Sequence, residues 1–285
     1  MTTEKLSFSP APEAVILIAG KGAYPLELAE SARRQGVKRL FVAAFKGETE
    51  RRLAALADEI AWLRLGRLDD LLAALAATGI RHAVMAGQIT PTSLFSVRFD
   101  SRTLALLRKL PVKNAETIFG AIGGELASLG IALLPAWMFM QSAMPAPGVL
   151  TARIPTEAEK RDIALGFRVA KTTSGLDIGQ TVTVKDGVIL SVEAFEGTDA
   201  AIRRGGELGG PGLVVAKVAK RGHDTRFDIP VIGLRTLEGL RKIKASVLAV
   251  EAGRTLLLER EKLIRAADDW SISLEAVDAG DEQFG

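Results

Sequence analysis

The stretch AVILIAGKGAYPLELAESARRQG, residues 14–36, decides what fold to expect. Its opening run at 14–19 is short and continuously apolar, which is typical of a strand buried on both faces. The run ends in the glycine turn GKG at 20–22, and Pro25 follows where the first turn of a helix tolerates proline. A helix is then expected over 26–35, closed by a glycine. A strand, a glycine turn and a helix in this order open a parallel sheet covered by helices.

The alternation of strands and helices continues to about residue 134. Apolar or alternating runs predict strands at 40–44, 60–65, 82–86 and 131–134. Leucines and other apolar residues at helical spacing predict helices at 49–56, 69–77, 101–110 and 116–129. Because parallel strands need crossover connections, this order predicts an α/β fold that begins with a Rossmann-like parallel sheet.

The clearest linker is PAPG at 145–148. We therefore expect two domains: an N-terminal Rossmann-like domain at 14–144 and a C-terminal mixed α/β domain at 151–278, joined by 145–150. Since the linker separates two such domains, it is also the expected hinge.

Local signals place the elements of the second domain. A capping box from Thr156 to Glu159 starts a helix that runs to about residue 172. Asp186-Gly187 joins two strands as a hairpin. The expected strands are 180–185, 188–193, 213–218 and 247–250, and the further helices are 199–208, 237–243 and 260–268. The polar chain end is expected to fray.

Composition limits the chemistry. The chain has 285 residues, no cysteine and two histidines, so thiolate sites and cysteine nucleophiles are excluded and a multi-histidine metal site is disfavoured. If a metal is used, oxygen ligands point to Mg²⁺, Mn²⁺ or Ca²⁺. The net charge of +3 is compatible with an anionic ligand but too weak to indicate nucleic acid. No apolar run is long enough to span a membrane, and a cytoplasmic protein is expected.

Two glycine-containing turns follow strands of the first domain. Gly20, Lys21 and Gly22 follow the first strand, and Gly87 with Gln88 follow the strand at 82–86. Ligands of parallel sheets bind at the carboxyl ends of strands, so both turns are predicted to bind substrate phosphates through backbone amides. The glycines do not complete a dinucleotide signature, and a tight strand-to-helix turn is the alternative. His82 begins its strand, at the opposite edge, and is expected to be structural.

The stretch 193–230 mixes carboxylates, bases and glycines around the apolar run 213–218. Glu196 and Asp199 flank the start of a predicted helix, where they can hold a Mg²⁺ that also binds phosphate; Glu193 is a lesser candidate. The substrate-binding residues predicted in this stretch are Gly197, Thr198, Lys217 and Arg226. The alternative is that Thr198 or Asp199 is a helix N-cap and that the charges form ordinary salt bridges.

The segment PAWMFMQSAM at 135–144 is rich in methionine and aromatic residues. Such side chains are most often core, and that is the expectation for any one of them. A seam between two copies in a homodimer, or an adaptable apolar groove for acyl chains, is the alternative.

Four blocks carry a family resemblance: LIAGKGAYP at 17–25, LDIGQTVTVKDGVILSVEAFEGTDAAIRRGGEL at 176–208, VVAKVAKRGHDTRFDIPVIG at 214–233 and AVEAGRTLLLEREKLI at 249–264. Together they resemble the UDP-2,3-diacylglucosamine pyrophosphatase family of lipid A biosynthesis that is unrelated to metallophosphoesterases. The resemblance extends over nearly all of residues 14–277. One departure is His223, where the family pattern leads us to expect glutamine.

The resemblance implies an activity and its partners. It implies Mg²⁺-dependent hydrolysis of UDP-2,3-diacylglucosamine to UMP and 2,3-diacylglucosamine 1-phosphate, with the lipid held between two α/β domains. It also implies peripheral contact with the cytoplasmic face of the inner membrane. With the motif around it, Asp224 is expected to be a metal ligand or the general base for the attacking water. A nucleotide-sugar transferase and a non-catalytic lipid or nucleotide carrier are the alternatives.

Overall fold

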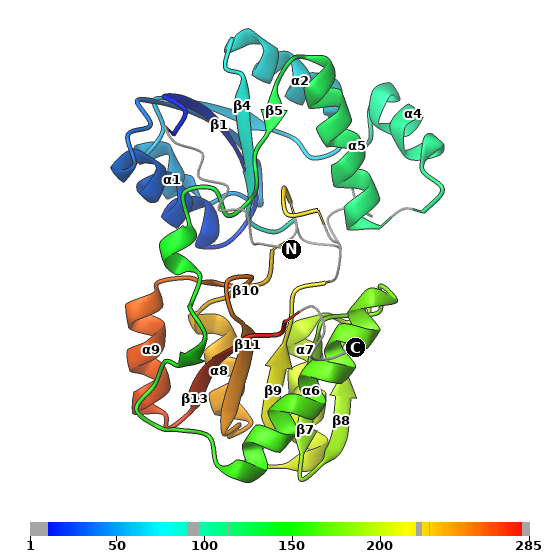
Figure 1. Ribbon diagram of the computed structural model, residues 1–285. Helices are drawn as coiled ribbons and strands as arrows, with labels where there is room; N and C mark the ends of the chain where they lie inside the picture. Colours follow the sequence, from blue (N-terminus) through cyan, green and yellow to red (C-terminus); the bar gives the residue numbers. More distant parts are fainter. Residues whose placement is uncertain (1–10, 90–96, 113, 221–223, 228, 281–285) are drawn as a thin grey trace. The chain divides into compact units, whose positions relative to one another are not determined.

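The computed structural model describes residues 11–89, 97–112, 114–220, 224–227 and 229–280. The chain forms two compact units (Figure 1). The N-terminal unit comprises Met1–Phe139 together with Asp224–Asp228, and the C-terminal unit comprises Met140–His223 together with Ile229–Gly285. Each unit is an α/β structure around its own sheet, as the sequence predicts.

The N-terminal unit has a five-stranded sheet in the order β3-β2-β1-β4-β5. All of its neighbouring strands are parallel. The strands are β1 (Ala14–Ala19), β2 (Arg39–Phe45), β3 (Glu59–Leu63), β4 (His82–Ala86) and β5 (Ala132–Leu133). β1 and β4 have the bounds that the sequence predicts, because each is a short apolar run between clear turn signals.

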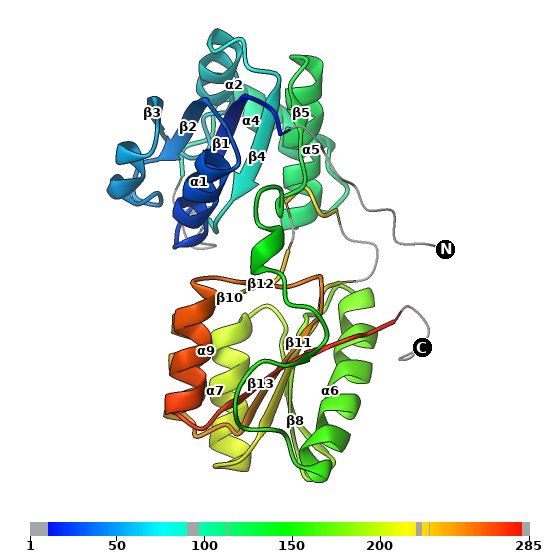
Figure 2. The same cartoon turned by 60° about the vertical axis from the view of Figure 1, so that its left-hand side comes forward.

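Helices cover both faces of this sheet. They are α1 (Tyr24–Arg34), α2 (Leu68–Ala77), α4 (Ser101–Lys109) and α5 (Ala115–Ser128). Alternate residues of β1, Ile16 and Ile18, pack in one core cluster with side chains of α2, α4 and α5. The intervening residues of β1 are buried on the other face, where α1 packs against β1 and β4 (Figure 2). Residues 49–56, expected to be an α-helix, form only the 3₁₀ helix η1 (Arg51–Ala55), since Glu50 is extended and Thr49 bonds neighbouring strands.

The C-terminal unit has a mixed six-stranded sheet in the order β6-β13-β11-β9-β7-β8. β9, β11 and β13 are parallel to one another, while β6, β7 and β8 are antiparallel to their neighbours. The strands are β6 (Gly148–Val149), β7 (Thr181–Lys185), β8 (Val188–Val192), β9 (Val214–Lys217), β11 (Val247–Glu251) and β13 (Ser273–Val277). A separate parallel pair is formed by β10 (Val231–Ile232) and β12 (Leu256–Leu257).

The C-terminal sheet also lies between two helical layers. Its helices are α6 (Glu157–Gly175), α7 (Thr198–Gly209), α8 (Leu234–Lys242) and α9 (Arg260–Asp269). Phe167 of α6 packs with Val182 and Ala216 on one face, whereas Leu237 of α8 and Leu263 of α9 pack with strand residues on the other. Figure 2 shows α6 on one side of the sheet and α7 and α9 on the opposite side. The predicted capping box at Thr156 and the Asp186-Gly187 hairpin are both present.

Three regions differ from the sequence-based expectation. The chain end was expected to fray, but β13 is a buried strand paired with β11; its single carboxylate, Glu275, breaks the apolar pattern that predicts such strands. The expected linker at 145–150 contains β6, which pairs with β13. The helix of α7 begins at Thr198 with Gly197 as its N-cap, so neither Thr198 nor Asp199 is the cap.

A short segment of the second half of the sequence belongs to the N-terminal unit. Asp224–Asp228 is grouped with that unit, where the amide of Ala136 donates to the carbonyl oxygen of Thr225 at 2.8 Å. The rings of Phe119 and Phe227 lie 6.0 Å apart. Asp224 was expected in the C-terminal domain; a contact between segments so far apart in sequence leaves no local signal.

The middle of the methionine-rich segment at 135–144 is buried. Met138, Phe139 and Met140 are at most 3% exposed. Phe139 has a positive φ of 70°, and its carbonyl oxygen accepts hydrogen bonds from Ser31 and Gln35 of the N-terminal unit. This burial supports the core interpretation over a groove open to a ligand. Within the described residues, no helix is long and apolar enough to cross a membrane.

Candidate functional site

The order in which successive strands are added to the N-terminal sheet reverses between β1 and β4. Successive strands proceed from β1 to β2 and β3 on one side, and from β4 to β5 on the other. In open parallel sheets such a switch point is where ligands bind, beyond the carboxyl ends of the strands. The predicted turns at 20–22 and 87–88 follow β1 and β4 and therefore lie at this position.

Backbone hydrogen bonds tie the two turns together. The amide of Lys21 donates to the carbonyl oxygen of Gln88 at 2.7 Å, and the amide of Gln88 donates back at 3.1 Å. The amide of Gly20 donates to Ala86 at 2.8 Å. A Cβ on Gly20 would lie 2.5 Å from the carbonyl oxygen of Gln88, so glycine is needed for this close approach. Since the turns bond each other, the amides of Gly20, Lys21 and Gln88 are not presented to an anion as the sequence suggested.

Gly22 differs from its neighbours. Its φ is +99°, and nothing lies within 4 Å of the position that a Cβ would occupy. It leads into α1, whose N-cap, Ala23, has no side chain that could accept a hydrogen bond from the first amides of the helix. Of the predicted phosphate-binding turn, this end is therefore the part that neighbouring atoms do not crowd.

Thr49 fixes the same sheet edge and was not singled out from the sequence. Its hydroxyl donates to the carbonyl oxygen of Ala19 at 2.5 Å and accepts from the amide of Phe45 at 2.8 Å. It therefore joins the ends of β1 and β2. Glu48 beside it is only 7% exposed. The residues after β2 give no pattern in the sequence that distinguishes them from an ordinary polar turn.

The corresponding edge of the C-terminal sheet carries buried charges. β9 ends at Lys217, and because β7 is antiparallel to β9 and β8 to β7, Thr181 and Glu193 lie at the same edge. The start of α7 brings Thr198 to this edge. Lys217 is 7% exposed and Glu193 is 9% exposed. Sequence reasoning predicted Lys217 and Thr198 as substrate-binding residues and Glu193 as a lesser metal candidate, and the structure brings these three together.

A directed chain of hydrogen bonds links these side chains. Lys217 Nζ donates to Thr198 Oγ1 at 3.0 Å, and Thr198 Oγ1 donates to Glu193 Oε1 at 3.0 Å. The second carboxylate oxygen, Glu193 Oε2, is buried and has no hydrogen-bond partner among the described residues. A buried ammonium and a buried carboxylate are thus joined through one hydroxyl.

The backbone just after Lys217 is held by a buried ion pair. Lys171 of α6 and Glu251 at the end of β11 lie 2.6 Å apart and are 4% and 3% exposed. Lys171 Nζ donates to the carbonyl oxygen of Ala219 at 3.0 Å, and Glu251 Oε2 accepts from the amide of Ala219 at 2.7 Å. Glu251 belongs to a block that carried the family resemblance, but its role was not predicted.

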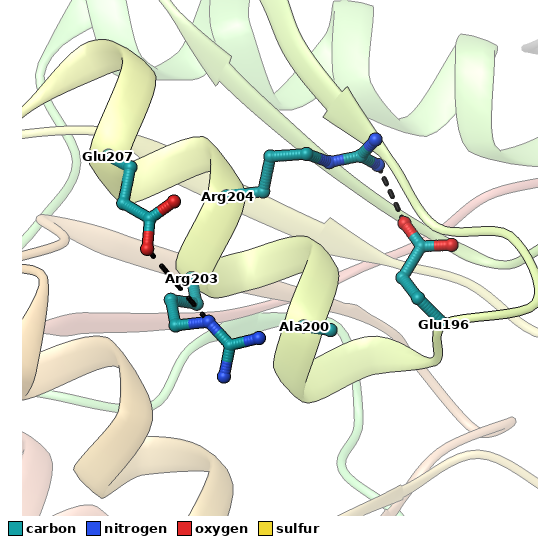
Figure 3. Close-up of a pocket in the computed structure, with 5 residues that line it drawn as sticks. All are labelled: Glu196, Ala200, Arg203, Arg204 and Glu207. Atoms are coloured by element: carbon teal, nitrogen blue, oxygen red, sulfur yellow. Dashed lines mark hydrogen bonds and ion pairs between the residues drawn. The ribbon is translucent and has the colours of Figure 1, made fainter.

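The predicted metal ligands of the C-terminal unit lie elsewhere on α7 and its N-terminal loop. Glu196 Oε1 bonds Arg204 at 2.7 Å, which Figure 3 shows beside the Arg203–Glu207 pair. Asp199 bonds Arg235 at 3.0 Å. Both are partly exposed carboxylates with an arginine counterion, which is the salt-bridge alternative considered for these positions.

Asp224 is also paired with an arginine. The guanidinium of Arg226 contacts both carboxylate oxygens, with Nε at 2.8 Å from Oδ1 and 2.9 Å from Oδ2. The Arg226 amide donates to Oδ1 at 3.0 Å, closing a tight local turn. The hydrogen bond to Asp224 raises the pKa of Arg226, so this guanidinium stays charged. The predicted pair Asp224 and Arg226 is therefore a preformed unit, and His223 beside it lies outside the described residues.

The carboxylates do not form a ready metal site as they lie. Among the described residues there is no group of three or more histidine, aspartate or glutamate side chains placed to hold a metal ion. Asp224 belongs to one unit and Asp199 and Glu196 to the other, and each carries an arginine.

Comparison with known proteins defines the class of this chain. Residues 14–143 match the model of the LpxI N-terminal domain, and residues 146–275 match the model of the LpxI C-terminal domain. A curated relative from Caulobacter vibrioides, named UDP-2,3-diacylglucosamine pyrophosphatase LpxI, is 31% identical over 281 residues, covering 92% of this chain and 96% of the relative. The chain is a two-unit α/β protein of the hydrolase type. It belongs to the LpxI family.

Proposed function

We propose that this protein hydrolyses the pyrophosphate bond of UDP-2,3-diacylglucosamine, releasing UMP and 2,3-diacylglucosamine 1-phosphate. The observation that carries the proposal is the relationship over nearly the whole chain to a relative named for that activity. Both family domains are present and in order, so the proposal does not depend on one shared module.

In the C-terminal unit, Lys217 is proposed to bind the diphosphate. Its ammonium is buried at the carboxyl end of a parallel strand, where bound anions are common. Thr198 stands at the N-terminus of α7, where helix amides favour negative charge. A cation and a helix N-terminus at one sheet edge match a substrate whose reacting centre carries two phosphoryl groups.

In the N-terminal unit, Asp224 is proposed to act as the base. Water attacks one phosphorus atom and passes a proton to the carboxylate, while the bridging P–O bond breaks and its electron pair leaves with the oxygen of the departing phosphate. The bidentate contact with Arg226 holds the carboxylate in one orientation. The open turn at Gly22 is proposed as an additional anion contact.

The direct test is product analysis with purified protein and UDP-2,3-diacylglucosamine in the absence of any acceptor. We expect equal amounts of UMP and 2,3-diacylglucosamine 1-phosphate, each formed over many turnovers. A transferase would release nothing without its acceptor, and a carrier would bind the substrate at one equivalent without product. Either result would contradict the proposed hydrolysis.

Mg²⁺ dependence is a separate proposal. It is supported by the oxygen-only ligand chemistry of a chain without cysteine and by the family resemblance. Mg²⁺, when bound, neutralises charge on phosphate oxygens. Activity is expected to vanish in EDTA and return with Mg²⁺ or Mn²⁺. Full activity after exhaustive chelation would remove the metal from the reaction.

Peripheral contact with a membrane surface is also proposed, because the proposed substrate carries acyl chains. Phe195 is 94% exposed and Leu176 is 68% exposed, and both lie at the sheet edge that carries Lys217. Gly179 packs against the backbone of Glu193, which brings the two loops together. Replacing Phe195 and Leu176 with serine is expected to reduce co-sedimentation with anionic phospholipid vesicles. Val188, 57% exposed at the opposite end of the same hairpin, is the matched control, and an equal loss for Val188→Ser would contradict the assignment.

Homodimerisation is a last prediction from the sequence. Analytical ultracentrifugation measures it directly, and a single species of 30.3 kDa at micromolar concentration would contradict it.

A further inference from the structure

The strongest unexplained feature is a buried carboxylate and a buried lysine that are bridged by one hydroxyl group. Ions this deeply buried are normally paired or richly hydrogen-bonded, because desolvation penalises each charge. Here Thr198 Oγ1 stands between them, 3.0 Å from Lys217 Nζ and 3.0 Å from Glu193 Oε1.

The hydroxyl of Thr198 has only one proton, and the carboxylate cannot donate when ionised. The proton therefore points at Glu193, and the oxygen lone pair points at Lys217. This fixes the direction of one N–H of the ammonium. The hydroxyl of Thr181 lies 3.5 Å from Thr198 Oγ1 on the neighbouring strand, which leaves little room for Thr198 to rotate away.

The backbone two residues after Lys217 is also held in place. Ala219 follows Lys217 by two residues, and both its N–H and its C=O are bonded by the buried Lys171–Glu251 pair. Arg254 also contacts Glu251 Oε1 at 3.3 Å. The chain that follows β9 therefore cannot move without breaking its hydrogen bonds to a buried ion pair.

We propose that Glu193 and Thr198 are positioning residues that aim the Lys217 ammonium at the substrate diphosphate, while Lys171 and Glu251 immobilise the strand end that carries it. This inference rests on the proposed function, because it assigns a purpose to the predicted phosphate contact. The carboxylate also offers a negative counterpart to the buried lysine when no phosphate is bound. Glu193 acts through Thr198, and neither carboxylate is required to touch the substrate.

The test uses the full-length protein and steady-state hydrolysis. Thr198→Val keeps the shape of the side chain but removes the hydroxyl, and it is expected to lower kcat/KM by about 10- to 100-fold, the range for one hydrogen bond to a charged group. Thr198→Ser restores the hydroxyl and should recover activity to within about threefold of wild type. Thr183→Val is the matched control: Thr183 loses a buried hydroxyl bond to Ser191 in the same sheet, away from Lys217.

A double variant separates positioning from ordinary stability. If Thr198 works through Lys217, adding Thr198→Val to Lys217→Met should change kcat/KM no further, because coupled residues are non-additive. A multiplied loss in the double variant, or an equal loss in Thr183→Val, would overturn the proposal. Glu193→Gln keeps an acceptor for Thr198 but removes the charge, and is expected to lose less activity than Thr198→Val.

A second readout does not depend on hydrolysis. In protein labelled with ¹⁵N-lysine, the Lys217 ammonium is expected to give a slowly exchanging NMR signal that disappears in Thr198→Val and persists in Thr183→Val. An unchanged signal in Thr198→Val would show that Thr198 does not hold the Lys217 ammonium, and would overturn the proposal even if the enzyme is active. If the wild-type protein shows no hydrolysis, the proposed function fails. The NMR signal alone then decides whether Thr198 holds the Lys217 ammonium.

Discussion

The carboxyl ends of the parallel strands are held by different interactions in the two units. In the N-terminal unit the ends of β1 and β4 are joined by backbone hydrogen bonds between glycine turns. In the C-terminal unit the end of β9 is surrounded by buried charged side chains, Lys217, Glu193, Lys171 and Glu251. The first edge is rigid because of its backbone, whereas the second places ionic groups where water is excluded. Glycine turns after parallel strands therefore do not by themselves identify the edge that carries the chemistry.

The largest expected effect concerns the buried ion pair of the C-terminal unit. Removing one member, as in Lys171→Met, takes the buried ammonium away from Glu251 and leaves Arg254, 3.3 Å away and largely exposed, as a weaker counterion; this should lower the free energy of unfolding by about 3–5 kcal/mol. Replacing both, as in Lys171→Met with Glu251→Leu, should recover much of that loss in chemical denaturation. An exposed pair, Lys38–Glu13, is the control and should change stability by less than about 1 kcal/mol. A small effect of Lys171→Met on the free energy of unfolding would show that the Lys171–Glu251 ion pair does not stabilise the unit.

Asp224 is the sharpest test of the N-terminal unit's side chains. Asp224→Ala should lower kcat by at least about 100-fold, the scale of a lost acid–base group, while thermal unfolding changes little. Glu59→Ala is the control, since it removes the carboxylate of another exposed arginine pair in the same unit. Hydrolysis near the wild-type rate by folded Asp224→Ala would show that Asp224 and Arg226 form only a structural turn.

The bridged glycine turn makes a prediction about stability. In Gly20→Ala the new Cβ would meet the backbone of Gln88 at 2.5 Å, so a backbone atom must shift. We expect a loss of about 1–3 kcal/mol in unfolding free energy, the range for overpacking. Gly47→Ala, at a turn with open space around it, tests the cost of a positive φ alone. Equal losses for the two variants would mean that the close approach at Gly20 does not matter.

The smallest expected effect concerns Glu275 on β13. Burial raises the pKa of this carboxyl group, with Lys160 opposing the shift. The folded protein therefore binds this proton more tightly than the unfolded chain does. The resulting stabilisation is present at pH values below the usual glutamate pKa and is lost as pH rises through the raised pKa.

Glu275→Gln should consequently be more stable than wild type at pH 8, by up to about 1 kcal/mol, and equal to it at pH 4. Thermal unfolding across this range measures the difference. The exposed Glu238→Gln is the control. A variant that is less stable than wild type at pH 8 would show that the Glu275 charge is favourable in the folded state.

The sequence predicted the parts of the fold that depend on local patterns. The strands β1 and β4 have the predicted bounds, since each is a short apolar run that ends at a glycine turn. β13 was missed because Glu275 lies within a run of otherwise apolar and small residues, and only tertiary burial makes it a strand. The 3₁₀ helix at Arg51–Ala55 is shorter than predicted because Thr49 binds the sheet instead of starting a helix.

The site was predictable in residue type but not in grouping. Lys217 and Thr198 were singled out, and the structure joins them with Glu193 through hydrogen bonds. The partners of the predicted carboxylates, Arg204, Arg235 and Arg226, follow from side-chain directions that no spacing rule supplies. The clamp of Lys171 on Ala219 joins residues 48 positions apart, which is beyond any local pattern.

Two lysines at matching positions test the central comparison most directly. Lys21 follows β1 in the N-terminal unit and is exposed, whereas Lys217 ends β9 in the C-terminal unit and is buried beside Thr198. We would measure kcat/KM for UDP-2,3-diacylglucosamine with Lys21→Met and Lys217→Met, both checked for folding by circular dichroism. The predicted result is a loss of at least about 100-fold for Lys217→Met and less than about fivefold for Lys21→Met. Equal losses, or a larger loss at Lys21, would contradict the assignment of the ionic chemistry to the C-terminal edge.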